Sequence, residues 1–188
     1  RYVFQPELSN TLAGGSGNPS ITQLSNLAFQ YKYDGRKRMI EKRVPGSDWV
    51  YMVYDERDRL VFTQDANQRA NWQWMFTKYD QLNRPIITGI YTHSANITRD
   101  VMKGLLSTTV FSESYDGVGP HGYSNTVLKA PNFVEANFDV LTVTYYDGYN
   151  FKSLIGNNNY DYDHTIIAGQ YNFDGSTIAY PYLKGQVT

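Results

Sequence analysis

Cysteine is absent from the chain, and its absence excludes disulfides, zinc–thiolate sites and thiol catalysis. Long apolar runs are absent too, so no segment has the roughly 18 residues of a membrane-spanning helix. Neither sign of charge dominates, because the net charge is −1 and the isoelectric point is near 6.3. Since a nucleic-acid partner requires a basic surface, this balance predicts that the chain does not bind nucleic acid. What remains is a folded protein of 188 residues, long enough for a sizeable core.

Tyrosine, in contrast, is abundant, with 17 copies. Tyrosine favours strands and forms cross-strand aromatic pairs in β sheets. A chain that is rich in tyrosine and glycine and poor in lysine is typical of exported β proteins. The composition therefore favours a mainly β protein that is secreted or displayed at a cell surface.

One pattern recurs along the first half of the chain. The stretch YMVYDERDRLVFTQD, residues 51–65, holds two strand-like segments separated by the charged residues 55–59. Similar stretches occur upstream, in YKYDGRKRMIEK, and downstream, in FTKYDQLNRPIITG. Self-similarity at a period of about 20–50 residues indicates a repeat architecture, not a unique active site. In each copy an arginine follows the aspartate of Tyr-Asp by four residues, which gives the sets Tyr33, Asp34, Arg38; Tyr54, Asp55, Arg59; and Tyr79, Asp80, Arg84.

Each copy predicts a strand, a tight turn and a return strand. Aspartate suits the first position of a type I turn, where its carboxylate accepts a hydrogen bond from the backbone N–H two residues on. In a hairpin such a turn is followed by a left-handed residue, and Asp58 and Asn83 tolerate that conformation. Lys37 does not, so we expect the first copy to shift its turn onto Gly35. The arginine is expected to lie across from its own aspartate or to reach a neighbouring hairpin, as a surface pair contributing about 0–1 kcal/mol.

These residues resemble the YD repeat of the RHS family, and the segments MVYDERDRLVFTQD and KYDQLNRPIITGIY are similar to Bacteroidetes-type RHS proteins. A partial fourth copy, LTVTYYDGYNF, carries Tyr146 and Asp147 but lacks the arginine. The resemblance covers about residues 29–91 and 141–151. The glycine of the family pattern is replaced in the three full copies by Lys37, Asp58 and Asn83.

The resemblance implies a mainly β fold of stacked antiparallel hairpins, as a fragment of a spiral β shell with one short helix. In the family such a shell encloses or presents a C-terminal toxin or other effector. The chain is then expected to be a non-catalytic wall segment of a secreted or cell-surface bacterial protein. Its expected partners are other segments of the same polypeptide shell and an effector cargo. Exposed edge strands also predict edge-to-edge self-association.

The chain divides by pattern into four parts. Residues 1–28 are expected to be a loop-rich lead-in, and residues 29–91 hold the three hairpins. Residues 92–140 are expected to be an insertion with one short helix and a glycine-rich loop that lies over the sheet. Residues 141–188 hold the partial fourth copy and further strands. No other substantial helix is predicted.

The helix of the insertion is predicted at about residues 98–107. Thr98 is its expected N-cap, because threonine there accepts the free N–H groups of a first helical turn. The apolar residues Ile97, Val101, Leu105 and Leu106 recur at helical spacing. We therefore expect this face to pack on the sheet.

Candidates for chemistry are few, and none predicts an enzyme, a metal site or a cofactor. The histidines His93, His121 and His164 are scattered over separate loops, whereas a metal site requires them to converge. Asp55 and Asp58 form a carboxylate pair, but the interleaved Arg57 and Arg59 are expected to keep both ionised, which defeats a general acid. The stretch NNNYDYDH resembles the front of a calcium loop but lacks its glycine and glutamate, so a hairpin loop is favoured for Asn157, Asn159, Asp161 and Asp163.

A second class of function stays open. Abundant tyrosines with Trp49, Trp72 and Trp74 provide flat rings that pack on the C–H faces of sugars, although core packing is the commoner use of such residues. The alternative function is therefore an extracellular aromatic-rich β module that binds carbohydrate at the cell surface.

Overall fold

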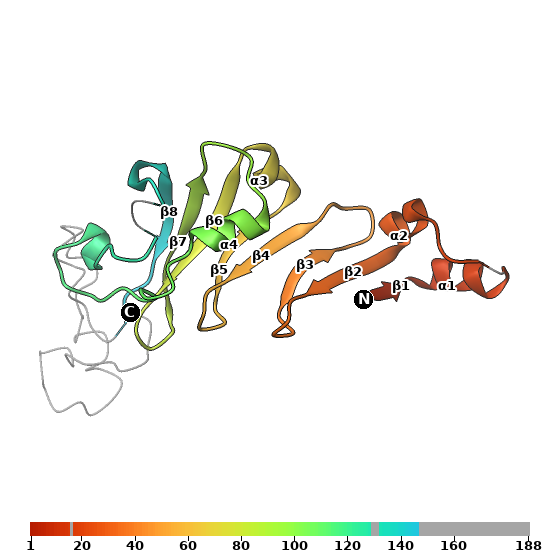
Figure 1. Ribbon diagram of the computed structural model, residues 1–188, viewed down its shortest axis with the longest axis horizontal. Helices are drawn as coiled ribbons and strands as arrows, with labels where there is room; N and C mark the ends of the chain where they lie inside the picture. The colour runs from red at the N-terminus through yellow and green to blue at the C-terminus, as the bar shows by residue number, and fades with distance from the viewer. Residues whose placement is uncertain (16, 129–131, 147–188) are drawn as a thin grey trace, which may run out of the picture.

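A single antiparallel sheet dominates the computed structural model, which describes residues 1–15, 17–128 and 132–146. Eight strands lie side by side in chain order, so each pairs with its sequence neighbour (Figure 1). The mainly β prediction is confirmed. The strands are β1 (Tyr2–Phe4), β2 (Ala28–Tyr33), β3 (Met39–Arg43), β4 (Val50–Tyr54), β5 (Leu60–Gln64), β6 (Gln73–Tyr79), β7 (Pro85–Thr92) and β8 (Phe138–Val143).

The three predicted hairpins are β2–β3, β4–β5 and β6–β7. Their turns lie in a row along one border of the sheet, at the bottom of Figure 1. Each pairing register shifts by one residue just before the tyrosine that ends the first strand, and the extra residue lies on the return strand, at Ile40, Val61 or Ile86. The predicted reversal at each Tyr-Asp is confirmed.

The expectation of one substantial helix is wrong, because the described residues hold several short ones. The lead-in predicted to be loop contains α1 (Pro6–Ala13) and α2 (Ile21–Leu27). Proline suits the first helical position of α1, and the fully buried Leu8 anchors that helix. Ser20 and Gln23 form a capping box at the start of α2. The other helical segments are α3 (Ala66–Ala70), α4 (Arg99–Leu105), η1 (Pro120–Gly122) and η2 (Glu135–Asn137).

The helix α4 is the one that the sequence predicts in the insertion. Thr98 caps it by accepting a hydrogen bond from the Val101 backbone N–H at 3.3 Å. Its predicted face is wrong at one position: Val101 is half exposed, whereas Met102 is fully buried. Met102 joins the core together with the partly buried Ile97 and Leu105. The side chain that packs inward is therefore one residue further along the helix than the spacing indicates.

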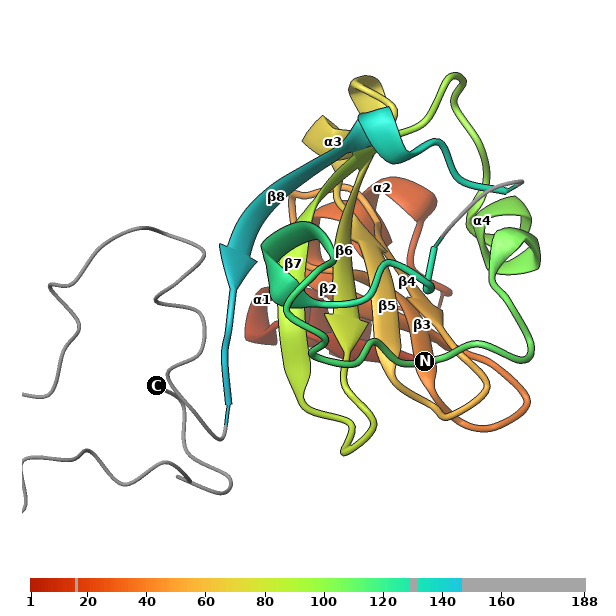
Figure 2. The same cartoon turned by 90° about the vertical axis from the view of Figure 1, so that its left-hand side faces the viewer.

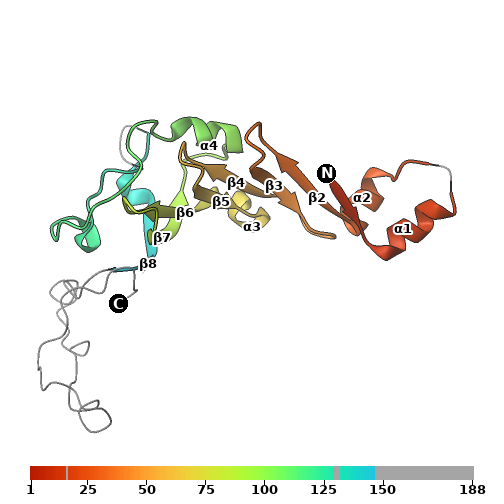
Figure 3. The ribbon, with the colours of Figure 1, turned by 90° about the horizontal axis from the view of Figure 1, so that it is seen from below.

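The hydrophobic core lies on one face of β4 to β8. It includes Phe62, Trp74, Phe76 and Tyr91 from the strands, and Phe133 from the segment that follows α4. Figure 3 shows α4 on that face, and Figure 2 shows the following segment running across the ends of the strands. Strands β1 to β3 contribute no residue to this core, so they extend beyond it as a wing (Figure 1).

Candidate functional site

The turns of the three hairpins share one set of hydrogen bonds. In the second hairpin the Asp55 N–H donates to the Arg59 carbonyl at 3.0 Å, and the Asp58 N–H donates to the Asp55 carbonyl at 3.1 Å. The Asp55 Oδ1 accepts the backbone N–H groups of Arg57 and Arg59, both at 2.9 Å. Corresponding bonds form at Asp34 and Asp80. The predicted role of the aspartate in the turn is confirmed.

A left-handed residue closes each turn. The φ angles are 64° at Lys37, 63° at Asp58 and 63° at Asn83. The expectation for Asp58 and Asn83 is confirmed, and the expected shift of the first turn onto Gly35 is wrong. The left-handed conformation costs a residue such as lysine about 1–2 kcal/mol. The hydrogen bonds that Asp34 makes across the turn hold Lys37 in that conformation.

Each arginine forms an ion pair with the aspartate of its own hairpin. The Nε–H to Oδ2 distances are 2.7 Å for Arg38, 2.8 Å for Arg59 and 2.6 Å for Arg84. The surface estimate for these pairs is wrong for the second hairpin. Only 8% of the Arg59 side chain and 6% of the Asp55 side chain are exposed, so water screens this pair far less than a surface pair.

Arg38 and Arg59 also reach forward to the next hairpin, so both sequence-based alternatives occur together. The Arg38 Nη1 donates to the Asp58 Oδ1 at 2.7 Å, and the Arg59 Nη1 donates to the Asn83 Oδ1 at 3.0 Å. The acceptor is the left-handed residue of the next turn in both interfaces. This residue therefore shapes its own turn and also accepts a hydrogen bond from the hairpin before it.

The tyrosine of each Tyr-Asp completes the contact from the other side. The guanidinium of Arg38 lies 5.0 Å from the Tyr54 ring centre, and that of Arg59 lies 4.7 Å from the Tyr79 ring centre. The Tyr54 hydroxyl donates to the Met39 carbonyl at 2.9 Å. The Tyr79 hydroxyl donates to the Leu60 carbonyl at 2.8 Å. Both carbonyls belong to the residue directly after the arginine.

The partial fourth copy repeats this arrangement. Arg84 lies 4.3 Å from the Tyr146 ring centre, and the Tyr146 hydroxyl donates to the Pro85 carbonyl at 3.0 Å. Asp147 lies outside the described residues. We call these contacts the arginine–tyrosine ladder, which consists of Arg38, Tyr54, Arg59, Tyr79, Arg84 and Tyr146.

The charged run of residues 55–59 is neutralised mostly between hairpins. Arg36 pairs with Asp58 at 3.0 Å and with Glu56 at 3.2 Å. The hydrogen bond from Arg36 holds the pKa of Asp58 below its usual value, with a further contribution from Arg38. The expected contribution of Arg57 and Arg59 at Asp58 comes instead from Arg36 and Arg38, and the Arg57 guanidinium stacks on Phe111. The run is thus an ionised contact between two turns.

A buried glutamate, which the sequence does not signal, joins the insertion to the sheet. Glu113 is fully buried and pairs with the Lys78 ammonium at 3.1 Å. It also accepts hydrogen bonds from Ser124 Oγ, from the N–H and hydroxyl of Thr126, and from the Val127 N–H, at 2.8–2.9 Å. Because both of its carboxylate oxygens accept hydrogen bonds, Glu113 links the insertion to the sheet and is not a free base.

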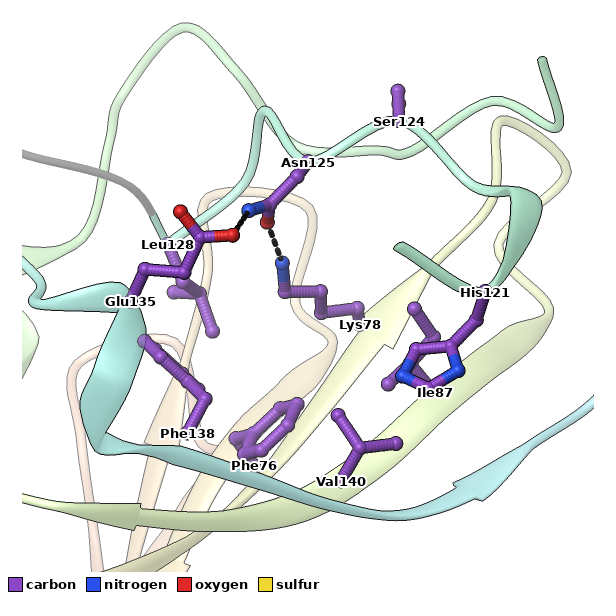
Figure 4. Close-up of a pocket in the computed structure, with 10 residues that line it drawn as sticks. All are labelled: Phe76, Lys78, Ile87, His121, Ser124, Asn125, Leu128, Glu135, Phe138 and Val140. Atoms are coloured by element: carbon purple, nitrogen blue, oxygen red, sulfur yellow. Dashed lines mark hydrogen bonds between the residues drawn. The ribbon is translucent and has the colours of Figure 1, made fainter. Parts of the chain in front are cut away.

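A cavity of about 190 Å³ lies beside the Lys78–Glu113 ion pair (Figure 4). Its polar rim is a chain of hydrogen bonds: Lys78 Nζ donates to Asn125 Oδ1 at 2.8 Å, and Asn125 Nδ2 donates to Glu135 Oε1 at 2.6 Å. The remaining lining includes the apolar Phe76, Ile87, Leu128, Phe138 and Val140. The Lys78 charge is already matched by Glu113, so the cavity accommodates an apolar group better than an anion.

Metal ligands do not gather anywhere in the described part of the chain. His93 donates or accepts within its own turn, at Ala95, and His121 lies at the rim of the cavity. His164 and the stretch NNNYDYDH lie outside the described residues. No helix within the described ranges is long and apolar enough to cross a membrane.

Comparison with protein-family models, with curated proteins and with solved structures finds no match. The arginine–tyrosine ladder is therefore characterised by its own geometry. It supplies repeated, largely internal contacts that hold consecutive hairpins in one register.

Proposed function

We propose that this chain is a non-catalytic structural segment, whose function is to form part of a rigid β-sheet wall. The observation that carries the proposal is the recurrence of one interface between consecutive hairpins, at β3–β4, β5–β6 and β7–β8. In each of them an arginine stacks on the next tyrosine, whose hydroxyl binds the carbonyl after the arginine. In repeat proteins, units that share one such interface can be stacked one after another, each contacting only its neighbours.

The resemblance to the YD repeat of the RHS family supports a more specific role. We infer a spiral β shell, formed with other segments of the same polypeptide, that encloses or presents a C-terminal effector or toxin. The setting that fits this role is the outside of a bacterial cell, either as a secreted protein or at the cell surface. The chemistry of the ladder agrees with a mechanical role, because its tyrosine hydroxyls, and the aspartates that its arginines bind, are occupied by internal partners.

The complete product of the gene that encodes this chain tests the proposal. We expect electron microscopy to show a hollow particle, and we expect limited proteolysis to leave the segment intact together with any enclosed domain. A variant with Arg59→Ala and Tyr79→Phe should open the wall and expose the interior to protease. A compact particle without a lumen would contradict the shell role.

Carbohydrate binding is the second candidate, and exposed rings favour it. Trp72 is 45% exposed, and Tyr2 and Phe4 stack on each other at the surface of β1. A glycan array probed with the chain distinguishes the two functions. Binding that is lost in the Trp72→Ala variant, with an unchanged melting temperature, would favour the carbohydrate module over the wall.

A further inference from the structure

The interfaces between consecutive hairpins share one pairing register. Glu41, seven residues after Asp34, pairs with Tyr51, three residues before Tyr54. Phe62 bears the same relation to Asp55 and pairs with Phe76, three residues before Tyr79. In the third interface the corresponding pair is Ile87 and Val143. The return strand of one hairpin therefore meets the first strand of the next in a fixed way.

The strand β1 occupies the place of a return strand in this scheme. Tyr2 pairs with Gln30, which stands three residues before Tyr33. Tyr2 therefore has the position that Glu41, Phe62 and Ile87 have in the other interfaces. Continued in the same register, the line of β1 places the position opposite Tyr33 two residues before Arg1. In the other interfaces this position holds the arginine.

Among the described residues, none makes the contacts that complete the other interfaces at this end. Tyr33 is 45% exposed, and within the described residues its hydroxyl makes no hydrogen bond, whereas Tyr54, Tyr79 and Tyr146 each bind a carbonyl. Tyr2 and Val3 of β1 are more than half exposed. Arg1 bonds to Tyr31 through both backbone groups, so the backbone of Tyr2 faces away from β2 and presents an open sheet edge.

We propose that the outer edge of β1 and the ring of Tyr33 are the docking site for one more hairpin of the same type, supplied by polypeptide continuous with β1. Its first strand pairs with the outer edge of β1, and its arginine lies on the Tyr33 ring. The inference rests on the proposed wall function and names the partner of the wall at the outer edge of β1. Continuity with three existing interfaces identifies this occupant.

A second copy of the chain fits this site less well. It offers a strand to the edge of β1, but the position opposite Tyr33 lies on the line of β1 itself, so only a chain continuous with β1 places an arginine there. One contact of the other interfaces has no counterpart at this end, because Lys37 carries an ammonium where Asp58 and Asn83 accept a hydrogen bond from the preceding arginine. Docking therefore relies on strand pairing and on Tyr33.

The test adds a hairpin that the chain already uses. A copy of residues 49–60, WVYMVYDERDRL, fused directly before Arg1 places the copied arginine opposite Tyr33. The control carries one inserted glycine between this extension and Arg1, because a slip of one residue turns every side chain to the other face. The readouts are the melting temperature, hydrogen exchange at the Tyr2 amide and sedimentation.

We expect the in-register extension to raise the melting temperature by about 2–4 °C over the slipped control. It should also slow exchange at the Tyr2 amide about tenfold, as expected for an edge amide that becomes paired. Tyr33→Phe should reduce the gain in the extended chain and change little in the chain without the extension.

Equal stability of the two extended chains would overturn the proposal. So would a dimer of the chain without extension in which the Tyr2 amide is already protected, because the occupant would then be a second copy. Neither result bears on whether the complete gene product forms a hollow particle, so failure here is distinguishable from failure of the proposed function.

Discussion

The aspartates of the three turns make the same bonds but lie in different surroundings. Asp55 and Arg59 are almost fully buried. The Phe111 carbonyl accepts a hydrogen bond from the Arg59 Nη2 at 2.5 Å. Asp34 and Arg38 lie on the open wing and are more exposed, at 19% and 14% of their side chains. The same motif therefore contributes different amounts to stability in different copies.

Replacing Asp55 by Ala should lower the free energy of unfolding by about 3 kcal/mol, because it leaves the buried Arg59 unpaired. Asp34→Ala, the matched variant in the first hairpin, should cost about 1 kcal/mol, which is the net contribution of an accessible hydrogen bond. Urea denaturation of the two variants measures the difference. Equal losses would show that burial does not set the value of this pair.

Lys37 is held left-handed without a side chain that suits that conformation. Lys37→Gly should stabilise the chain by about 0.5–1 kcal/mol, because glycine adopts positive φ without strain and this gain exceeds its greater freedom in the unfolded chain. Lys37→Ala removes the same charge but retains the strain, so it serves as the control and should change stability little. A glycine variant that melts no higher than the alanine variant would contradict this account.

At the scale of the elements, hairpins are joined through tyrosine hydroxyls that lie on alternate strands. Tyr54→Phe and Tyr79→Phe should each cost about 1 kcal/mol, the net value of a hydrogen bond lost while the ring stays in place. The two residues stand two strands apart, roughly 10 Å, so their costs should add in the double variant.

Tyr33→Phe is the internal control for this series, because its hydroxyl has no partner within the described residues and its loss should cost almost nothing. Denaturant titration of the four variants tests the prediction. A loss at Tyr33 as large as that at Tyr79 would mean that the hydroxyl bonds do not hold the hairpins together.

For the whole molecule, the row of turns makes stability depend on acid pH. Burial raises the pKa of Asp34, but the hydrogen bonds and the charge of Arg38 together lower it by more, so that the net shift is downward. The pKa of Asp58 is lowered chiefly by Arg36. The folded chain thus holds these protons more weakly than the unfolded chain, whose aspartates titrate near pH 3.9. Stability is present above about pH 4 and is lost as the pH falls through the lowered pKa values of the folded state.

Asp58→Asn should flatten this decline, because asparagine still offers Oδ1 to Arg38 but no longer titrates. The melting temperature measured from pH 7 down to pH 2 shows the slope. Glu7→Gln removes a carboxylate from the exposed side of α1 and serves as the control. A decline that is as steep in Asp58→Asn as in the parent chain would exclude Asp58 as a source of it.

The hairpins were determined by sequence alone, because their chemistry is local. A Tyr-Asp followed by arginine four residues later contains the turn, its hydrogen bonds and the ion pair within one short stretch. The alternation of apolar residues on either side then sets the strands. For the same reason the Thr98 cap and the helix α4 were predictable, since the capping side chain and the N–H that donates to it lie three residues apart.

Tertiary structure decided what distant segments do to one another. The choice of Met102 over Val101 as the buried residue of α4, and the anchoring of α1 through Leu8, depend on which surface each helix meets. Glu113 finds Lys78 across 35 residues of chain, and nothing near either residue in the sequence indicates the other. The ladder lies between these cases: its residues were predicted from their repetition, but their contacts arise only when one hairpin packs beside the next.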